Sequence, residues 1–139
     1  EQLGARVRVF TESDRGALGR LIRSDDDLAL IAGSITDEER ALRDRVRAWV
    51  DATLMPNISQ WYFDGIFPHH LVGAMAELGL LGPTIPTEYG GPGRSGVMYG
   101  LIMQELERCD SGIRSFASVQ SSLVMLPIYQ FGTEAQRQK

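Results

Sequence analysis

The amino-acid sequence predicts an all-α domain with one long ordered loop, and three observations support this class. Helical periodicity and helix-end residues define helices over residues 36–54, 68–78, 95–108 and 111–131. Glycines and prolines are densest over residues 79–94, between the second and third of these helices. That stretch also holds apolar side chains that can pack, so we expect an ordered loop and not a flexible linker; these are Leu80, Leu81, Ile85 and Tyr89.

The first of these helices has the clearest boundaries. Thr36 and Glu39 form a capping-box pattern, in which each side chain satisfies the other residue's backbone N–H. Met55 and Pro56 end the helix. Its apolar stripe recurs every three or four positions and consists of Leu42, Val46, Trp49, Val50 and Leu54.

The later helices carry terminal signals of the same kind. Pro68 suits the first position of the second helix, and Gly79 suits its C-terminal end. Gly132 ends the fourth helix, and Thr133 and Gln136 then form a second capping-box pattern. A fifth helix therefore begins about one turn before the last residue. Because a single turn cannot offset the cost of helix nucleation, we expect the chain to be a piece of a longer protein.

The start of the chain has weaker signals. We predict that residues 1–24 form an N-terminal extension without an assigned role and that residues 25–139 form the helical domain. Within the extension, residues 7–10 have the composition of a short strand and residues 14–23 that of a helix.

Composition excludes several functional classes. The 139 residues amount to about one domain, and 14 basic against 18 acidic residues give a net charge of −4, which does not suit a nucleic-acid surface. No apolar run approaches the roughly 20 residues of a membrane span. The single cysteine, Cys109, can form neither an internal disulfide nor a thiolate zinc site. No secretory signal is recognisable.

Two local patterns resemble binding motifs, but the neighbouring structure that each motif needs is not predicted here. Residues 91–96 match G-x-G-x-x-G, but Pro83 and Pro86 disrupt the preceding strand that a dinucleotide site needs. We interpret this segment as a loop that caps a helix. His69 and His70 are adjacent, so on a helix they point about 100° apart and cannot chelate one ion. We predict no metal site.

The helix over residues 111–131 carries a polar stripe with only one charge. On a helical wheel, Arg114 shares this stripe with Ser118, Ser121 and Ser122. The opposite side is apolar and contains Phe116, Val119, Leu123 and Leu126. One interpretation is an ordinary amphipathic helix with its polar face in water. The other is a ligand-facing surface, in which the arginine fork binds a carboxylate above the serine hydroxyls. The pattern leaves both open.

Five segments of the chain resemble the acyl-CoA dehydrogenase superfamily. They are residues 78–83 (LGLLGP), 89–93 (YGGPG), 105–115 (ELERCDSGIRS), 118–123 (SVQSSL) and 132–139 (GTEAQRQK). The third and fourth segments are most similar to its glutaryl-CoA dehydrogenase branch. The resemblance covers residues 25–139. It implies the N-terminal helical domain of a fold whose middle β domain and C-terminal helical bundle are absent from this chain.

This resemblance implies roles for four residues. Arg114 binds the distal carboxylate of a glutaryl group. Ser115 and Ser118 line the acyl end of the pocket, and Glu107 helps to position the carboxylate and the arginine. The implied reaction is the FAD-dependent oxidative decarboxylation of glutaryl-CoA to crotonyl-CoA and CO2, a step of lysine and tryptophan degradation. In the family the catalytic base and nearly all flavin contacts lie beyond Lys139, so we expect this chain alone to be inactive and not to retain FAD.

The same resemblance implies a homotetramer, an electron-transfer flavoprotein as electron acceptor, and a bacterial cytoplasmic or mitochondrial matrix location. Ile113 and Leu126 depart from the family pattern, and an aromatic cluster at residues 61–63 precedes the second predicted helix. These departures leave room for another short dicarboxylyl-CoA. Two further alternatives are an acyl-CoA dehydrogenase or oxidase of other chain specificity, with Arg114 paired to Glu107, and a catalytically silent helical assembly module.

Overall fold

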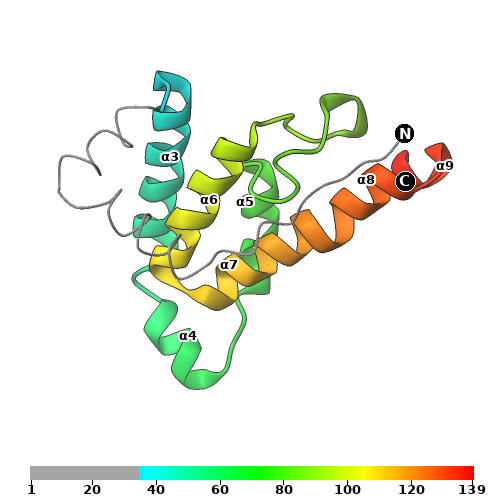
Figure 1. Cartoon of the computed structure of the whole chain (residues 1–139). Coiled ribbons are helices and arrows are strands. Elements are labelled where there is room, and N and C mark those ends of the chain that lie inside the picture. The colour runs from blue at the N-terminus through cyan, green and yellow to red at the C-terminus, as the bar shows by residue number, and fades with distance from the viewer. Residues whose placement is uncertain (1–34) are drawn as a thin grey trace, which may run out of the picture. The chain divides into compact units, whose positions relative to one another are not determined.

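Every regular element over residues 35–139, the part of the chain that the computed structural model describes, is helical (Figure 1). The predicted all-α class is therefore confirmed for this part. The strand and helix expected at residues 7–10 and 14–23, and the boundary between residues 24 and 25, lie outside the described residues. None of the described helices is long and apolar enough to cross a membrane.

The first described helix, α3 (Asp37–Trp49), continues into a π-helical turn, η1 (Val50–Leu54). Its predicted apolar stripe forms one side of the core, where Leu42 is 5% exposed and Val46 is fully buried. Three acidic residues in the first turn suit the positive end of the helix dipole. The predicted end at Leu54 is confirmed, because Met55 N–H still donates to the Val50 carbonyl at 3.0 Å and the helix stops there.

A short helix, α4 (Ile58–Asp64), was not predicted and contains the aromatic cluster of residues 61–63. It projects away from α3 and α6 (Figure 1). Trp61 packs against the core, whereas Tyr62 and Phe63 are 81% and 85% exposed. Asn57 at its start and Gly65 at its end, where φ is 65°, are typical helix-end residues, so the sequence contained end signals for α4 that the prediction did not use.

The second predicted helix begins later than expected. Pro68 precedes a 3₁₀ turn, η2 (His69–Leu71), and α5 (Val72–Glu77) follows. The predicted C-terminal glycine is confirmed, since Gly79 adopts a φ of 66°. Leu80 N–H donates to the Met75 carbonyl at 2.9 Å and Gly79 N–H to the Ala76 carbonyl at 2.8 Å, which is the Schellman arrangement.

The loop over residues 79–94 is ordered, as predicted, and contains one 3₁₀ turn, η3 (Thr87–Tyr89). Gly93 N–H donates to the Ile85 carbonyl at 2.9 Å, and Arg94 N–H donates to the Pro83 carbonyl at 2.7 Å. The Arg94 guanidinium also donates to the Gly79 carbonyl at 2.8 Å. The loop leads directly into α6 (Gly96–Cys109), whose N-cap Ser95 accepts a bond from Met98 N–H at 3.1 Å. The helix-capping interpretation of residues 91–96 is thus confirmed.

Helix α6 is the centre of the unit and contacts both α3 and α7 (Ser111–Ser118) (Figure 1). Its buried residues Met98, Ile102 and Leu106 meet the stripe of α3. A short connection turns the chain back, and Asp110 caps α7 by accepting a bond from Ile113 N–H at 2.9 Å. Helices α6 and α7 therefore lie against each other over residues that are close in sequence.

The fourth predicted helix is confirmed as one continuous rod (Figure 1). The rod comprises α7, a π-helical segment η4 (Val119–Met125) and α8 (Leu126–Phe131). Its buried residues recur every four positions and are Ile113, Ala117 and Ser121. Val119 and Leu123, on the predicted apolar side, are 46% and 69% exposed. The rod meets the core on the side of Ala117 and Ser121, and Phe116 of the apolar side also packs against that core, so the polar stripe does not lie wholly in water.

The fifth predicted helix is also confirmed. Helix α9 (Glu134–Arg137) begins with the expected capping box, in which Thr133 N–H donates to Gln136 Oε1 at 2.8 Å. Tyr89 Oη donates to Glu134 Oε2 at 3.1 Å, so the loop over residues 79–94 contacts this last turn.

Candidate functional site

The predicted site residues Arg114 and Glu107 form a direct ion pair across the turn between α6 and α7. Arg114 Nε donates to Glu107 Oε2 at 2.5 Å, and Ser111 Oγ donates to Glu107 Oε1 at 2.6 Å. The hydrogen bond from Arg114, followed by that from Ser111, holds the pKa of Glu107 below its ordinary value. Glu107 is therefore ionised at neutral pH, and both of its oxygens are engaged.

The guanidinium of Arg114 is only partly used by this pair. Its Nε makes the one side-chain hydrogen bond that Arg114 forms within residues 35–139. The side chain remains 34% exposed. Since an arginine presents five N–H donors in a planar fork, the Nη edge can still bind a second carboxylate in bidentate fashion.

Ser118 lies one helical turn beyond Arg114 on the same face of α7. Its Oγ accepts a bond from Tyr99 Oη at 3.3 Å, a contact that joins α7 to α6. Ser115, the fourth predicted site residue, is half-buried and makes no hydrogen bond through its side chain within the described residues. The structure thus brings Arg114 and Glu107 into contact, and it places Ser115 and Ser118 beside them on the helix without a direct bond to either.

The other two serines of the predicted stripe have structural roles. Ser121 is 4% exposed; its Oγ donates to the Ala117 carbonyl at 2.6 Å and accepts a bond from Gly82 N–H at 2.9 Å. Gly82 has a φ of 62°, and a Cβ there would lie 2.4 Å from Met125 Sδ, so the loop closely contacts η4. Ser122 Oγ donates to the Ser118 carbonyl at 2.7 Å.

Sequence reasoning missed a fully buried glutamate on the opposite face of α6. Arg47 binds Glu105 through two bonds, Nη2 to Oε1 at 2.7 Å and Nε to Oε2 at 3.0 Å, and Arg108 Nε donates to Oε2 at 3.1 Å. Arg108 also pairs with Asp51 at 2.5 Å. Burial raises the pKa of Glu105, but the hydrogen bonds and charges of Arg47 and Arg108 outweigh burial and leave the pKa below its ordinary value. No sequence signal joined Arg47 to Glu105, because 58 positions separate them.

Tyr99 was also missed. Tyr99, Met103 and Glu107 follow one another at intervals of four residues, so all three lie on one stripe of α6. That spacing was visible in the sequence and indicates a common face, although it does not indicate what the face contacts.

The histidines and the cysteine lie apart from this stripe. His69 and His70 sit in η2, where their rings contact Phe67 and Trp61 edge-on. Cys109 is the half-buried last residue of α6, and burial, followed by the charge of Asp110, raises its thiol pKa. Cys109 is therefore a thiol at neutral pH and not an activated thiolate. Within residues 35–139 no three His, Cys, Asp or Glu side chains gather closely enough to hold a metal ion.

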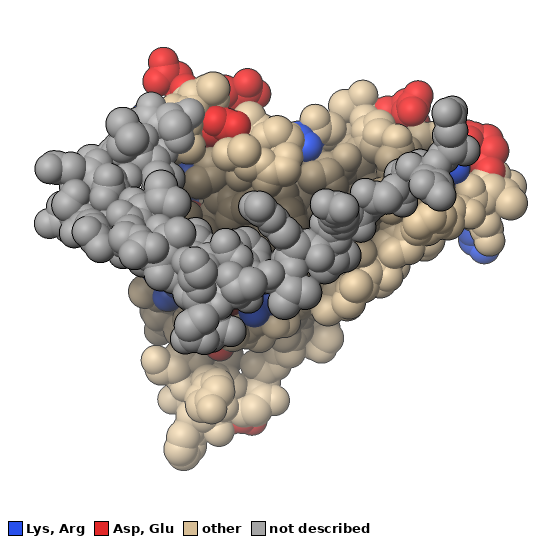
Figure 2. Space-filling model, in the orientation of Figure 1, with Lys and Arg blue, Asp and Glu red and all other residues tan. Residues whose placement is uncertain are grey.

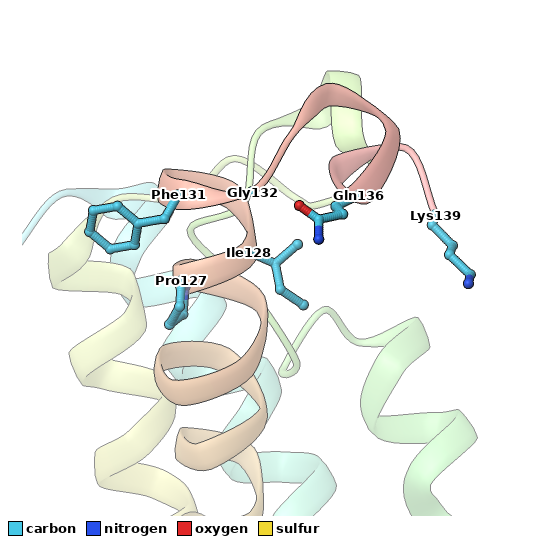
Figure 3. Close-up of a pocket in the computed structure, with 6 residues that line it drawn as sticks. All are labelled: Pro127, Ile128, Phe131, Gly132, Gln136 and Lys139. Atoms are coloured by element: carbon cyan, nitrogen blue, oxygen red, sulfur yellow. The ribbon is translucent and has the colours of Figure 1, made fainter.

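A groove of about 530 Å³ lies beside α8 and α9, at the C-terminal end of the rod (Figure 3). It is lined by Pro127, Ile128, Phe131, Gly132, Gln136 and Lys139. Phe131 is 84% exposed. This groove contains no carboxylate, histidine or thiol, so it lacks groups for acid–base or nucleophilic chemistry. Where the rod is visible in Figure 2 its surface is mostly uncharged, with charged side chains gathered at the α9 end.

The chain is similar to known flavoenzymes over most of its described length. A crystal structure of glutaryl-CoA dehydrogenase from Mycobacterium smegmatis is 46% identical, with a TM-score of 0.74, over 83% of this chain and 30% of that one. A crystal structure of a glutaryl-CoA dehydrogenase from the same organism, in complex with FADH2, is 42% identical with a TM-score of 0.71, over 74% of this chain and 26% of that one. The (2S)-methylsuccinyl-CoA dehydrogenase of Cereibacter sphaeroides is 33% identical over 91% of this chain and 23% of its own length.

These similarities identify the family and also show what share of its members' length the chain covers. The chain spans between 23% and 30% of the length of the three relatives named above. The family model for the acyl-CoA dehydrogenase N-terminal domain matches residues 36–139. The chain therefore belongs to the acyl-CoA dehydrogenase family, of which it carries the N-terminal helical domain.

Proposed function

We propose that the full-length protein is an FAD-dependent acyl-CoA dehydrogenase that oxidatively decarboxylates glutaryl-CoA to crotonyl-CoA and CO2. In this proposal the present chain binds the distal end of the acyl group. The observation that carries it is Arg114, the only charged residue between Ser111 and Phe131, whose Nη edge is available on a half-exposed polar stripe. Glu107 already pairs with Nε of Arg114, so it is the unused Nη edge that supports an anionic ligand group.

In this proposal each of the four site residues has a different role in binding the acyl group. Glu107 binds Nε of Arg114 and so fixes the plane of the guanidinium, leaving the Nη edge to face the ligand carboxylate. The hydroxyls of Ser115 and Ser118 donate further bonds to the same carboxylate or to the adjoining acyl chain. Neither nearby carboxylate is available as a base, because Glu107 is held by Arg114 and Ser111 and Asp110 caps α7. The role of these residues is therefore to bind and orient.

We expect the groove at the end of α8 not to hold the flavin. Its pyrophosphate needs a cluster of N–H or basic donors, whereas Gln136 and Lys139 are the only polar side chains that line this groove. We therefore assign FAD and the catalytic base to the rest of the full-length protein. We likewise propose, by family resemblance, a homotetramer that passes electrons to an electron-transfer flavoprotein, in a bacterial cytoplasm.

The relatives support a substrate with a distal carboxylate. Glutaryl and methylsuccinyl groups, named in two of the relatives, both end in one. The main alternative is a short uncharged acyl-CoA. The direct Arg114–Glu107 pair favours it, because the arginine already has a partner before any ligand binds.

Replacing Arg114 separates the two candidates. In the full-length holoenzyme, Arg114→Ala should lower kcat/KM for glutaryl-CoA by about 100-fold or more, since a charge-assisted bidentate contact is lost. Pentanoyl-CoA, which has five carbons and no carboxylate, should be turned over as before, with the flavin content unchanged. Arg45→Ala, which removes an exposed arginine of α3, is the matched control and should alter the turnover of neither substrate. An equal loss on both substrates would reject the carboxylate role.

A further inference from the structure

The contact between Tyr99 and Ser118 gives α6 and α7 a further polar link besides the bonds that Glu107 receives from Arg114 and Ser111. Tyr99 Oη lies 3.3 Å from Ser118 Oγ, and both residues are half-buried. The two helices pack against each other, so the contact lies on the same interface as the proposed site (Figure 1). At 3.3 Å the bond is longer than the usual separation of two hydroxyls, about 2.7–2.8 Å, so it is a weak contact that contributes little to the stability of the fold.

The direction of this bond decides what Ser118 can do. A phenol is a better donor than an aliphatic alcohol, so Tyr99 donates and Ser118 accepts. The serine hydroxyl has one hydrogen of its own, and that hydrogen remains to be donated elsewhere.

The neighbouring serines of the rod use their hydroxyl hydrogens differently from Ser118. Ser121 and Ser122 each donate to the carbonyl four residues back, at 2.6 and 2.7 Å. This is the ordinary use of a serine hydroxyl inside a helix. Ser118 makes no such bond, and within residues 35–139 its hydrogen has no acceptor.

We propose that Tyr99 is a positioning residue for the acyl carboxylate, acting through Ser118. By occupying the acceptor side of the Ser118 hydroxyl, Tyr99 directs its hydrogen toward the ligand, beside the Nη edge of Arg114. This inference rests on the proposed function. It assigns a specificity role to a residue of α6 that does not itself bind the carboxylate.

The test uses Tyr99→Phe in the full-length holoenzyme, which keeps the ring and removes only the hydroxyl. We expect kcat/KM for glutaryl-CoA to fall by about threefold to tenfold, the effect of one hydrogen bond, while kcat/KM for pentanoyl-CoA is unchanged. Tyr89→Phe removes a tyrosine hydroxyl that bonds Glu134, away from the stripe, and should alter neither value. Equal losses on both substrates for Tyr99→Phe would indicate a merely structural role and overturn the proposal.

A double-mutant cycle tests the route through Ser118. In a Ser118→Ala background, Tyr99→Phe should cause no further loss on glutaryl-CoA; additive losses would overturn the proposal. Affinity for glutaryl-CoA, read from the flavin absorbance, gives a second measure and should weaken in both single variants. If Arg114→Ala leaves the preference for glutaryl-CoA intact, the proposed function itself fails. If Arg114→Ala abolishes that preference while Tyr99→Phe has no effect, only this inference fails.

Discussion

Two glutamates of α6 lie two residues apart and both bind arginine, yet their surroundings are opposite. Glu105 is fully buried and receives three hydrogen bonds from Arg47 and Arg108. The Glu107 side chain is 45% exposed and binds one arginine, Arg114, and one serine. Glu105 therefore joins α6 to α3, whereas Glu107 faces the polar stripe of α7.

The difference shows how one helix can separate stability from binding. Burying a carboxylate is costly unless its lone pairs are satisfied, and Arg47 and Arg108 satisfy those of Glu105. The Arg114–Glu107 pair leaves part of the guanidinium without a partner, which suits a ligand and not a core. An ion pair in this domain is therefore structural where all its hydrogen-bonding groups are satisfied, and suits ligand binding where some of its donors remain unused.

Removing the charge of Glu105 should have the largest effect on stability. Glu105→Gln leaves Arg47 without its counter-charge and Arg108 with Asp51 alone, and because both arginine side chains are partly exposed we expect the free energy of unfolding to fall by about 2 kcal/mol. Denaturant unfolding of the full-length protein measures this. Glu107→Gln is the matched control two residues away and should unfold like the wild type. Equal destabilisation by both variants would remove the distinction between the two glutamates.

Glu107→Gln should instead affect selectivity. Without the charge of Glu107 the guanidinium of Arg114 is held less firmly, and we expect kcat/KM for glutaryl-CoA to fall about tenfold while pentanoyl-CoA is unaffected. Steady-state kinetics with both substrates checks this. Glu134→Gln, an exposed carboxylate on α9, serves as the control. A gain in activity on glutaryl-CoA would mean that Glu107 repels the substrate carboxylate more than it positions Arg114.

The pH dependence of stability should also follow Glu105. Burial raises its pKa, but the bonds from Arg47 and Arg108 leave the folded-state pKa below the ordinary value of 4.5. The ionised group therefore stabilises the fold above about pH 4.5, and this stabilisation is lost as the pH falls through the lower folded-state pKa. We expect the gap in melting temperature between wild type and Glu105→Gln to be constant from about pH 7 to 5 and to narrow below pH 4.5. A gap that narrows between pH 7 and 5 would mean that the pKa of Glu105 is raised.

The sequence predicted the fold where the determining contacts are local. The capping box at Thr133 and the helix end at Gly79 each involve residues within five positions of one another, and both are confirmed. Helix α4 was missed although Asn57 and Gly65 mark its ends, because Tyr62 and Phe63 are exposed and its apolar residues form no clear stripe. Its formation depends on Trp61 packing against the core, which no local pattern describes.

The candidate site was predictable only in part. Arg114 could be singled out because its helix has no other charge, but the roles of Ser115 and Ser118 came from family resemblance and stay predictions. The wheel could not say which side of the rod faces inward, since that depends on where α6 lies. Tyr99 escaped notice because its contact with Ser118 crosses 19 positions.

The smallest effect on the free energy of unfolding should come from a third arginine–carboxylate pair, Arg43–Asp44. This pair tests whether a short distance is enough to identify a strong interaction. Arg43 and Asp44 lie 2.6 Å apart, as close as the pairs of Glu105 and Glu107. They are adjacent in sequence on α3, and the side chain of Asp44 is 54% exposed, so water competes for the same groups. We expect Asp44→Asn to change the free energy of unfolding by less than about 0.5 kcal/mol. A loss comparable to that of Glu105→Gln would show that burial and full satisfaction are not what distinguishes the glutamates of α6.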